Sequence, residues 1–407
     1  MGLRRVVITG IGVVSALGHG RAAFWEALRE GRPGIAPIEA VDCSQMRFRN
    51  GAEVRGFNPE AHMDAREAGF LDRFAQFALI AAREAVADSG LEFTPALRET
   101  AAVVTGSCVG GQSTQDQGFV DLYLEKRPRV HPLTIPKTMA NAGASRISLE
   151  YGLHGPAFTI STACSSSNHA LGQAFWLLRQ GAVSVAIAGG SEAPFSMGLL
   201  KAWEALRVVS PDTCRPFCRD RRGMILGEGA AMLVLEALDA ARARGARIYA
   251  EIVGFGMSSD AHHITQPSME GPARAMRMAL SDGAAPPEAV GYVNAHGTGT
   301  PANDPTETRA IREVFGAHAD RLAVSSTKSM HGHALGAAGG LEAAATALAL
   351  HHGILPPTAN FTEADPECGL DVIPNVARRA EPEYAISNSF AFGGLNAVVA
   401  FRRWIGM

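Results

Sequence analysis

Cysteine is scarce in this chain, with six residues in 407, and the six are irregularly spaced. A small secreted domain that depends on disulfides would carry a denser set, so a disulfide framework is excluded. Cys214 and Cys218 stand four apart, but no matching second pair of ligands follows at a spacing typical of zinc. The sequence therefore predicts neither structural disulfides nor a metal site.

An excess of either charge is also lacking, because 37 basic and 40 acidic residues leave a net charge of -3. No basic stripe is interleaved with aromatic residues, which argues against a nucleic-acid-binding protein. Basic residues gather locally at Lys126, Arg127 and Arg129 and again at Arg215, Arg219, Arg221 and Arg222. Each group is either a solvated face or a docking patch for an acidic partner, and the sequence leaves both open.

Long hydrophobic runs are missing as well. The longest candidate, residues 336–350, contains Glu342 and consists mostly of alanine and glycine. Two arginines precede an apolar N-terminal run, but Gly10 and Gly12 interrupt it, and no clean cleavage site follows. Position 6 is Val6, which disfavours myristoylation. We expect a cytoplasmic protein that has no membrane partner.

What the chain does have is 47% hydrophobic residues and ten short, continuous apolar runs. Such runs are typical of strands covered on both faces. Five lie in the first half, at 4–10, 100–106, 156–162, 183–190 and 230–236; five lie in the second, at 248–255, 290–297, 322–328, 383–390 and 396–402. Helical patterns follow at 72–89, 165–180 and 339–352, and we interpret 191–229 as an ordered excursion. The sequence thus predicts a duplicated α/β fold with halves at 1–247 and 248–407.

Cys164 is the first candidate for chemistry. It follows an apolar strand and a turn of small residues, and a helical pattern begins directly after it. Backbone N–H groups and the helix dipole at that position favour a thiolate and so predict a lowered cysteine pKa. Small neighbours leave room for a substrate. The alternative is that Cys164 is simply a small buried apolar residue.

Histidines at the ends of two predicted strands support the catalytic interpretation. His296 ends one predicted strand and opens a glycine- and threonine-rich loop, while His331 and His333 follow another strand that ends in Lys328. Ligand and catalytic sites of α/β folds lie at such strand ends. Metal binding is the rival use, but no further ligand set has recognisable spacing. The pairs His262/His263 and His351/His352 are interpreted as surface residues without a role.

A last segment, residues 388–394, reads NSFAFGG. Phe392, Gly393 and Gly394 form a flexible turn whose N–H groups could point into a cleft. Taken alone, it is an ordinary hairpin turn between two strands.

Together, the motifs VVITG (6–10), TACSSS (162–167), LGEGA (226–230), NAHGTGT (294–300), STKSMHGH (326–333) and NSFAFGG (388–394) resemble the β-ketoacyl-acyl-carrier-protein synthases of the elongating type. The resemblance covers essentially the whole chain. It implies a thiolase-like fold, in which helices lie between two five-stranded mixed sheets and on their outer faces. It also implies that the protein is usually a dimer. It also implies Cys164 as nucleophile, His296 and His333 as the paired histidines, and Lys328 and Glu342 as their supports.

Further roles are implied by the same motifs. Asp304, eight residues after His296, matches a family position near the second histidine loop. Thr298 and Thr300 match the threonines that bind the phosphopantetheine arm. Phe392 matches the gatekeeper whose N–H joins that of Cys164 in an oxyanion hole.

The chain departs from the family pattern at His331, Ala391 and Leu395, where the family often has Thr, Gly and Thr. The third histidine puts the protonation behaviour of the site in question. By similarity, Val109 and Thr134 would line the acyl pocket across a dimer interface, and the small Thr134 suggests room for a longer or stiffer chain. The segment 200–223 is particularly similar to ketosynthases of rhizobial nodulation pathways.

The resemblance therefore implies a ketosynthase that condenses malonyl-acyl carrier protein with a Cys-bound acyl chain, in fatty-acid or specialised biosynthesis. It would need no metal or redox cofactor and would act as a homodimer or with a chain-length factor. Three rivals remain. A thiolase would need a second cysteine in the loop 390–396, and a non-catalytic chain-length subunit would lack Cys164. A dinucleotide oxidoreductase would rest on Gly10-x-Gly12-x-x-Ser15, a weak match.

Overall fold

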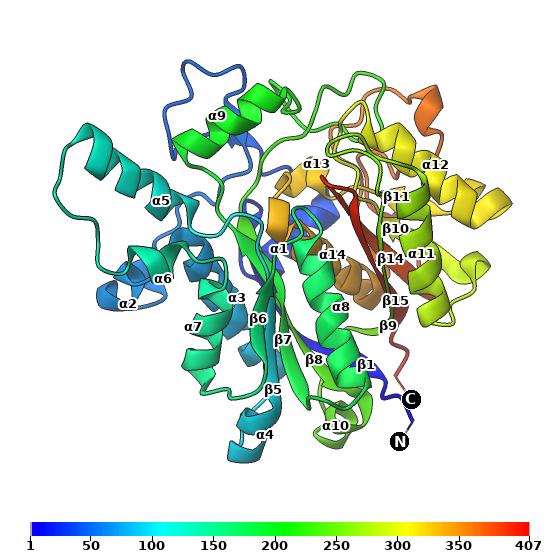
Figure 1. The fold of residues 1–407 in the computed structure, drawn as a ribbon. Coiled ribbons are helices and arrows are strands. Elements are labelled where there is room, and N and C mark those ends of the chain that lie inside the picture. The colour runs from blue at the N-terminus through cyan, green and yellow to red at the C-terminus, as the bar shows by residue number, and fades with distance from the viewer. Residues whose placement is uncertain (1, 407) are drawn as a thin grey trace.

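The computed structural model describes residues 2–406 and contains one large mixed sheet with helices on its faces (Figure 1). The strand order is β11-β10-β14-β15-β9-β1-β8-β7-β5-β6, and the short β2 (Gly18–His19) pairs with β1. The first half contributes β1 (Val6–Ser15), β5 (Ala101–Gly106), β6 (Ala157–Ile160), β7 (Val185–Glu192) and β8 (Gly229–Ala237). The second half contributes β9 (Ala250–Ser259), β10 (Val290–Asn294), β11 (Ala323–Ser325), β14 (Tyr384–Ala391) and β15 (Leu395–Arg403).

All ten predicted strands are confirmed, five in each half. The halves are joined where β1 pairs antiparallel with β9 over a short stretch, Val6 to Ile8 against Ala250 to Ile252. Backbone hydrogen bonds at this seam make the two five-stranded sheets continuous. Two further small sheets are formed by β3 (Ala36–Pro37) with β4 (Asn50–Gly51) and by β12 (Ile354–Leu355) with β13 (Arg378–Arg379).

Two helices lie between the halves and form the centre of the core. The helix α8 (Ser166–Arg179) packs on β5 and β7 and also on β15 and β9, and α14 (Ala338–His352) packs on β14, β8 and β15. Residues 338–350 of α14 are all buried. A helix that is apolar on every side suits such a position. At Gly339 a Cβ would meet the Asn168 side chain at 2.6 Å, so the two helices approach more closely than larger residues allow.

Other helices cover the outer faces. The helix α3 (Arg73–Ser89) packs on β1 and β8, and α11 (Glu270–Asp282) packs on β9 and β15. The predicted helices at 72–89, 165–180 and 339–352 are confirmed within one residue at each end. The remaining helices are α1 (Arg21–Glu30), α2 (Ala65–Gly69), α4 (Pro95–Thr100), α5 (Gln112–Phe119), α6 (Thr134–Thr138), α7 (Ala142–Tyr151), α9 (Met197–Leu206), α10 (Leu238–Ala243), α12 (Asn303–Phe315) and α13 (Lys328–His331).

Close packing explains two glycines that also suggested a nucleotide motif. A Cβ at Gly10 would lie 2.1 Å from the Ala85 carbonyl oxygen, and one at Gly12 would lie 1.9 Å from that of Ala81. Both glycines therefore let β1 lie directly against α3.

The predicted boundary at 247/248 falls between α10 and β9 and stays a prediction, because the core between the sheets draws on both halves. Within residues 2–406, no helix combines the length and the apolar composition needed to cross a membrane.

Candidate active site

Cys164 sits on a strained turn between β6 and α8. Ala163 adopts a left-handed backbone (φ 49°), which a side chain tolerates only where the surroundings fix it. Serine hydroxyls do so here: Ser166 Oγ accepts from the Thr162 N–H at 2.9 Å, and Ser165 Oγ donates to the Thr162 carbonyl at 2.8 Å. The turn holds the sulfur at the cavity wall with 7% of the residue exposed.

The predicted lowering of the Cys164 pKa is wrong for this structure. Burial raises the pKa of the thiol to about 12, and the positive charge of Lys328 only partly opposes this rise. The helix begins at Ser166, so the helix start is as expected, but desolvation of the anion outweighs it. Cys164 therefore rests as a neutral thiol and loses its proton only in the course of the reaction.

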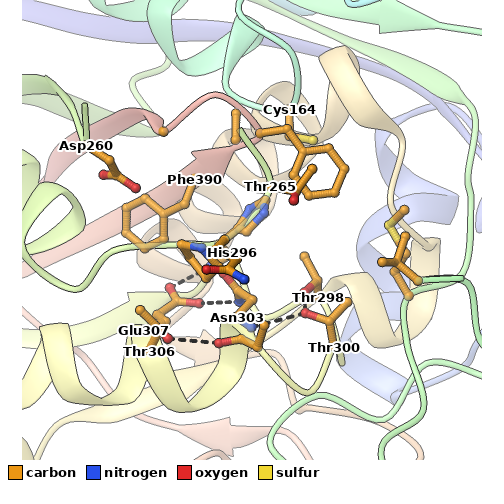
Figure 2. A pocket seen from close by; sticks show the side chains of 18 of the residues that line it. Cys164, Asp260, Thr265, His296, Thr298, Thr300, Asn303, Thr306, Glu307 and Phe390 are labelled. Atoms are coloured by element: carbon orange, nitrogen blue, oxygen red, sulfur yellow. Dashed lines mark hydrogen bonds between the residues drawn. The ribbon is translucent and has the colours of Figure 1, made fainter. Parts of the chain in front are cut away.

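His296 is held by carboxylates behind the loop that follows β10. Its backbone N–H and that of Gly297 donate to the two oxygens of Glu307, both at 2.8 Å. Asp304 accepts from the Gly299 N–H at 3.2 Å and from the Phe217 N–H at 2.8 Å. Two buried carboxylates on α12 thus fix the whole loop. Figure 2 shows His296 between Cys164 and Glu307.

His333 follows α13 and is fixed by the neighbouring backbone. Its N–H donates to the Ile225 carbonyl at 2.6 Å, and its own carbonyl accepts from the Gly227 N–H at 2.9 Å. The ring Nδ1 accepts from the Leu335 N–H at 3.2 Å, so a neutral His333 carries its proton on Nε2. The rings of His296 and His333 are 5.4 Å apart and nearly perpendicular.

Lys328 and Glu342 form a fully buried ion pair behind the histidines. Lys328 Nζ also lies 3.3 Å from Nδ1 of His296. Burial raises the pKa of Glu342 to about 7, with the lysine opposing. Burial first, and Lys328 second, hold the pKa of both His296 and His333 well below the usual value. Both imidazoles are therefore neutral near pH 7 and can donate a hydrogen bond to a developing anion.

The turn between β14 and β15 closes one side of the cavity. Gly393 (φ 82°) and Gly394 (φ 71°) take left-handed conformations, and the Gly393 N–H donates to the Ile264 carbonyl at 2.7 Å. The Phe392 ring stacks on Trp203 with centroids 6.1 Å apart. Glycines are needed here because both backbone conformations are strained for other residues.

The cavity has a volume of about 210 Å³. Six of the predicted residues line it: Cys164, His296, His333, Phe392, Thr298 and Thr300. The hydroxyls of Thr298 and Thr300 are 2.9 Å apart. Lys328, Glu342 and Asp304 are buried behind this wall. Val109 and Thr134 are not among the lining residues, so their place in an acyl pocket stays a prediction.

The comparisons with known proteins agree with this geometry. The family description "Beta-ketoacyl synthase, N-terminal domain" matches residues 3–241, and "Beta-ketoacyl synthase, C-terminal domain" matches 249–362. The chain belongs to the β-ketoacyl synthase family. It is an acyltransferase-type condensing enzyme of this family, with the thiolase-like fold.

Similar β-ketoacyl synthase sequences extend over almost the full chain. Nodulation protein E of Rhizobium sp. is 46% identical over 98% of this chain and 99% of its own length. The 3-oxoacyl-[acyl-carrier-protein] synthase 2 of Synechocystis sp. is 42% identical over 98% of each. The ishigamide ketosynthase/chain length factor structure, at 38% identity, has a TM-score of 0.93 over 99% of this chain and 100% of its own. The predicted similarity to rhizobial nodulation proteins is thus confirmed.

Sequence reasoning missed several residues of this ketosynthase site. Glu307 and Asn303 line the cavity, and Asn303 Nδ2 donates to Asp304 at 3.1 Å and to Glu307 at 3.3 Å. The signal available was an acidic pair at the start of the helix after the His296 loop. His263, given no role, also lines the cavity.

His331, by contrast, does not line the cavity. Its Nδ1 lies 2.8 Å from the Gly332 carbonyl and its Nε2 2.9 Å from Thr327 Oγ1, which fixes the tautomer with the proton on Nδ1. Burial lowers its pKa to about 3, so it stays neutral beside Lys328. Among residues 2–406 no group of three or more His, Cys, Asp or Glu is placed to hold a metal ion.

Proposed function

We propose that this ketosynthase condenses malonyl-acyl carrier protein with an acyl chain bound to Cys164 and releases 3-oxoacyl-acyl carrier protein and carbon dioxide. The observation that carries the proposal is the convergence of one thiol and two neutral imidazoles on one cavity. This set of groups suits a reaction in which a nucleophile is acylated and an enolate is then stabilised.

The first step is acyl transfer. Cys164 Sγ attacks the acyl thioester, the thiol proton passes to the sulfur of the departing phosphopantetheine arm, and the acyl chain remains on Cys164. Backbone N–H groups of Cys164 and Phe392 would stabilise the oxyanion, an effect worth about 3 kcal/mol for one donor in well-studied sites. Thr298 and Thr300 would hold the phosphopantetheine arm.

The second step is decarboxylation and condensation. The carbon–carbon bond to the malonyl carboxylate breaks, and its electron pair becomes an enolate on the thioester. His333 donates Nε2–H to that oxygen, because its Nδ1 is already an acceptor for the Leu335 N–H. His296 can donate in the same way, with Nδ1 facing Lys328. The carbanion then attacks the acyl-Cys164 carbonyl, and the Cys164 thiolate leaves and takes up one proton from bulk water.

The partners, cofactor needs, location and product also belong to this proposal. The partner is an acyl carrier protein, and the chain works in a homodimer or beside a chain-length factor, with Cys164 making it the catalytic subunit. No cofactor is required, and the enzyme acts in the cytoplasm. The 46% identity to Nodulation protein E favours a specialised acyl chain as product. A thiolase is disfavoured because the loop 390–396 has no cysteine.

Replacing the nucleophile tests the proposal. Cys164→Ala should abolish condensation of malonyl-carrier with acyl-carrier, while Cys164→Gln should still release carbon dioxide from malonyl-carrier because His296 and His333 remain. Product is measured by mass spectrometry and carbon dioxide by radiolabel, and Cys43→Ala serves as the control. Elongation at the normal rate by the Ala variant would refute the mechanism, and a silent Gln variant would contradict the histidine roles.

A further inference from the structure

Glu192 is a buried carboxylate that the steps above do not use. It ends β7, is fully buried, and accepts four hydrogen bonds. Oε1 accepts from Ser107 Oγ at 3.0 Å and from the Val109 N–H at 3.2 Å, and Oε2 accepts from the Cys108 N–H at 2.6 Å and the Gly336 N–H at 3.0 Å. None of the ion pairs within residues 2–406 includes it. Hydrogen bonds alone therefore stabilise this anion.

These four donors come from both halves of the fold. Ser107, Cys108 and Val109 form the turn after β5, where the acyl pocket is predicted, whereas Gly336 belongs to the loop that starts at His333. Gly336 makes a second hydrogen bond, because Ser167 Oγ of α8 donates to its carbonyl oxygen. A Cβ at Gly336 would lie 2.3 Å from the Cys108 nitrogen and 2.5 Å from Glu192 Oε2, so the contact is as close as glycine permits.

Gly336 directly follows Leu335, a residue with a strained backbone that contacts His333. Leu335 has a left-handed backbone (φ 47°), and its N–H is the donor to Nδ1 of His333. A strained conformation persists only where the surroundings hold it. The N–H of the next residue, Gly336, donates to Glu192. Loss of that hydrogen bond would free Leu335 to relax and would withdraw its N–H from His333.

We propose that Glu192 is a positioning residue of the condensation: its carboxylate ties the turn at Cys108 and Val109 to the Leu335–Gly336 peptide and so fixes the tautomer and place of His333. The inference rests on the proposed function for its kinetic consequences, but the geometry of His333 is open to measurement without it. The carboxylate form is required, since a protonated acid or an amide offers fewer acceptor sites to four donors.

The ionisation of Glu192 gives the proposal a pH signature. Burial raises its pKa to about 7, against the four hydrogen bonds, so the carboxylate form is present above about pH 7 and is lost as the pH falls. The titratable groups facing it are the thiols of Cys108 and Cys164, and burial raises the pKa of both. Glu342, beside Lys328, has the other pKa of about 7 in the site. Ser107 contacts Glu192 and not Glu342, so a Ser107 variant distinguishes the effect of Glu192 on the pH profile from that of Glu342.

The test measures decarboxylation and condensation from pH 5.5 to 9 in the full-length enzyme. Glu192→Gln should reduce kcat about tenfold at pH 8 and less than about twofold at pH 6, because the wild type itself loses the carboxylate there. Ser107→Ala removes one donor to the anion, so it should move the acid limb of the profile to higher pH. Glu251→Gln, which removes a buried carboxylate paired with Arg5 at the start of β9, should keep the wild-type profile.

Side-chain ¹⁵N spectra of the histidines supply a readout that does not depend on activity. In the wild type the Nδ1 resonance of His333 should be that of an acceptor nitrogen, and Glu192→Gln should change it while Glu251→Gln should not. An unchanged His333 resonance, or a Ser107→Ala profile that does not move, overturns the role of Glu192. A wild type without condensation would refute the proposed function instead, and the spectra would still decide about Glu192.

Discussion

At the scale of single residues, burial decides the chemistry of this site more than local sequence does. Cys164 stands before a helix, which should favour its thiolate, yet desolvation raises its pKa to about 12. The same burial lowers the pKa of His296 and His333 and keeps them neutral. A neutral thiol beside neutral imidazoles avoids charge separation until a substrate arrives. Reactivity then depends on proton transfer within the site rather than on a standing thiolate.

This view predicts how Cys164 reacts with iodoacetamide. Because the thiolate fraction grows about tenfold per pH unit below the pKa, the rate of alkylation should keep rising from pH 6 to pH 9 without a plateau. Mass spectrometry of the Cys164 peptide over time measures it, with an exposed model thiol such as glutathione as the reference. A plateau below pH 8 would show that the helix start outweighs burial.

At the scale of elements, small residues set how closely helices approach the sheet. The strand β1 carries Gly10 and Gly12 on the side that faces α3, where Ala81 and Ala85 present backbone oxygens. The helix α14 also approaches α8 closely at Gly339, where a Cβ would meet the Asn168 side chain. Because α8 begins just after Cys164 and α14 carries Glu342, this second contact helps to determine where Cys164 and Glu342 lie with respect to each other. Glycine here reflects packing distance rather than flexibility.

A single methyl group at this contact should be costly. Gly12→Ala would place Cβ at 1.9 Å from a backbone oxygen, so α3 must move away from β1. We expect a loss of about 1–3 kcal/mol in the free energy of unfolding, as for other overpacked cores. Gly69→Ala is the matched control, because nothing lies within 4 Å of its added Cβ. Urea unfolding followed by circular dichroism measures both, and equal stability of the two variants would contradict the packing argument.

At the scale of the whole molecule, the two halves share one interior. The core cluster around α8 and α14 includes Phe175 from the first half and Phe401 from the second. The catalytic groups are divided in the same way, with Cys164 on one side and both histidines on the other. Neither half can bury its inner sheet face alone. The fold therefore couples assembly of the site to assembly of the core.

This sharing predicts one cooperative unfolding transition. Tryptophan fluorescence should report mainly on the first half, which holds Trp25, Trp176 and Trp203, with Trp404 alone in the second. A hydrogen-exchange probe of β10 and β14 reports on the second half. The two signals should show the same urea midpoint within error, as expected for a single core. Midpoints that differ clearly would mean that 1–247 and 248–407 unfold as separate domains.

The sequence by itself determined the ten strands and the three main helices, because apolar runs and helical periodicity are local properties of the chain. Its motifs also pointed to Cys164, His296, His333 and Phe392, and the structure brings these four residues to one cavity. Only the tertiary structure decided the ionisation of these groups and the contacts of Glu307, Asn303 and Glu192. Ionisation depends on burial, and the hydrogen bonds of Glu192 depend on partners 80 or more residues away in the sequence, such as Cys108 and Gly336. Desolvation and long-range hydrogen bonds exist only once both halves have closed around α8 and α14.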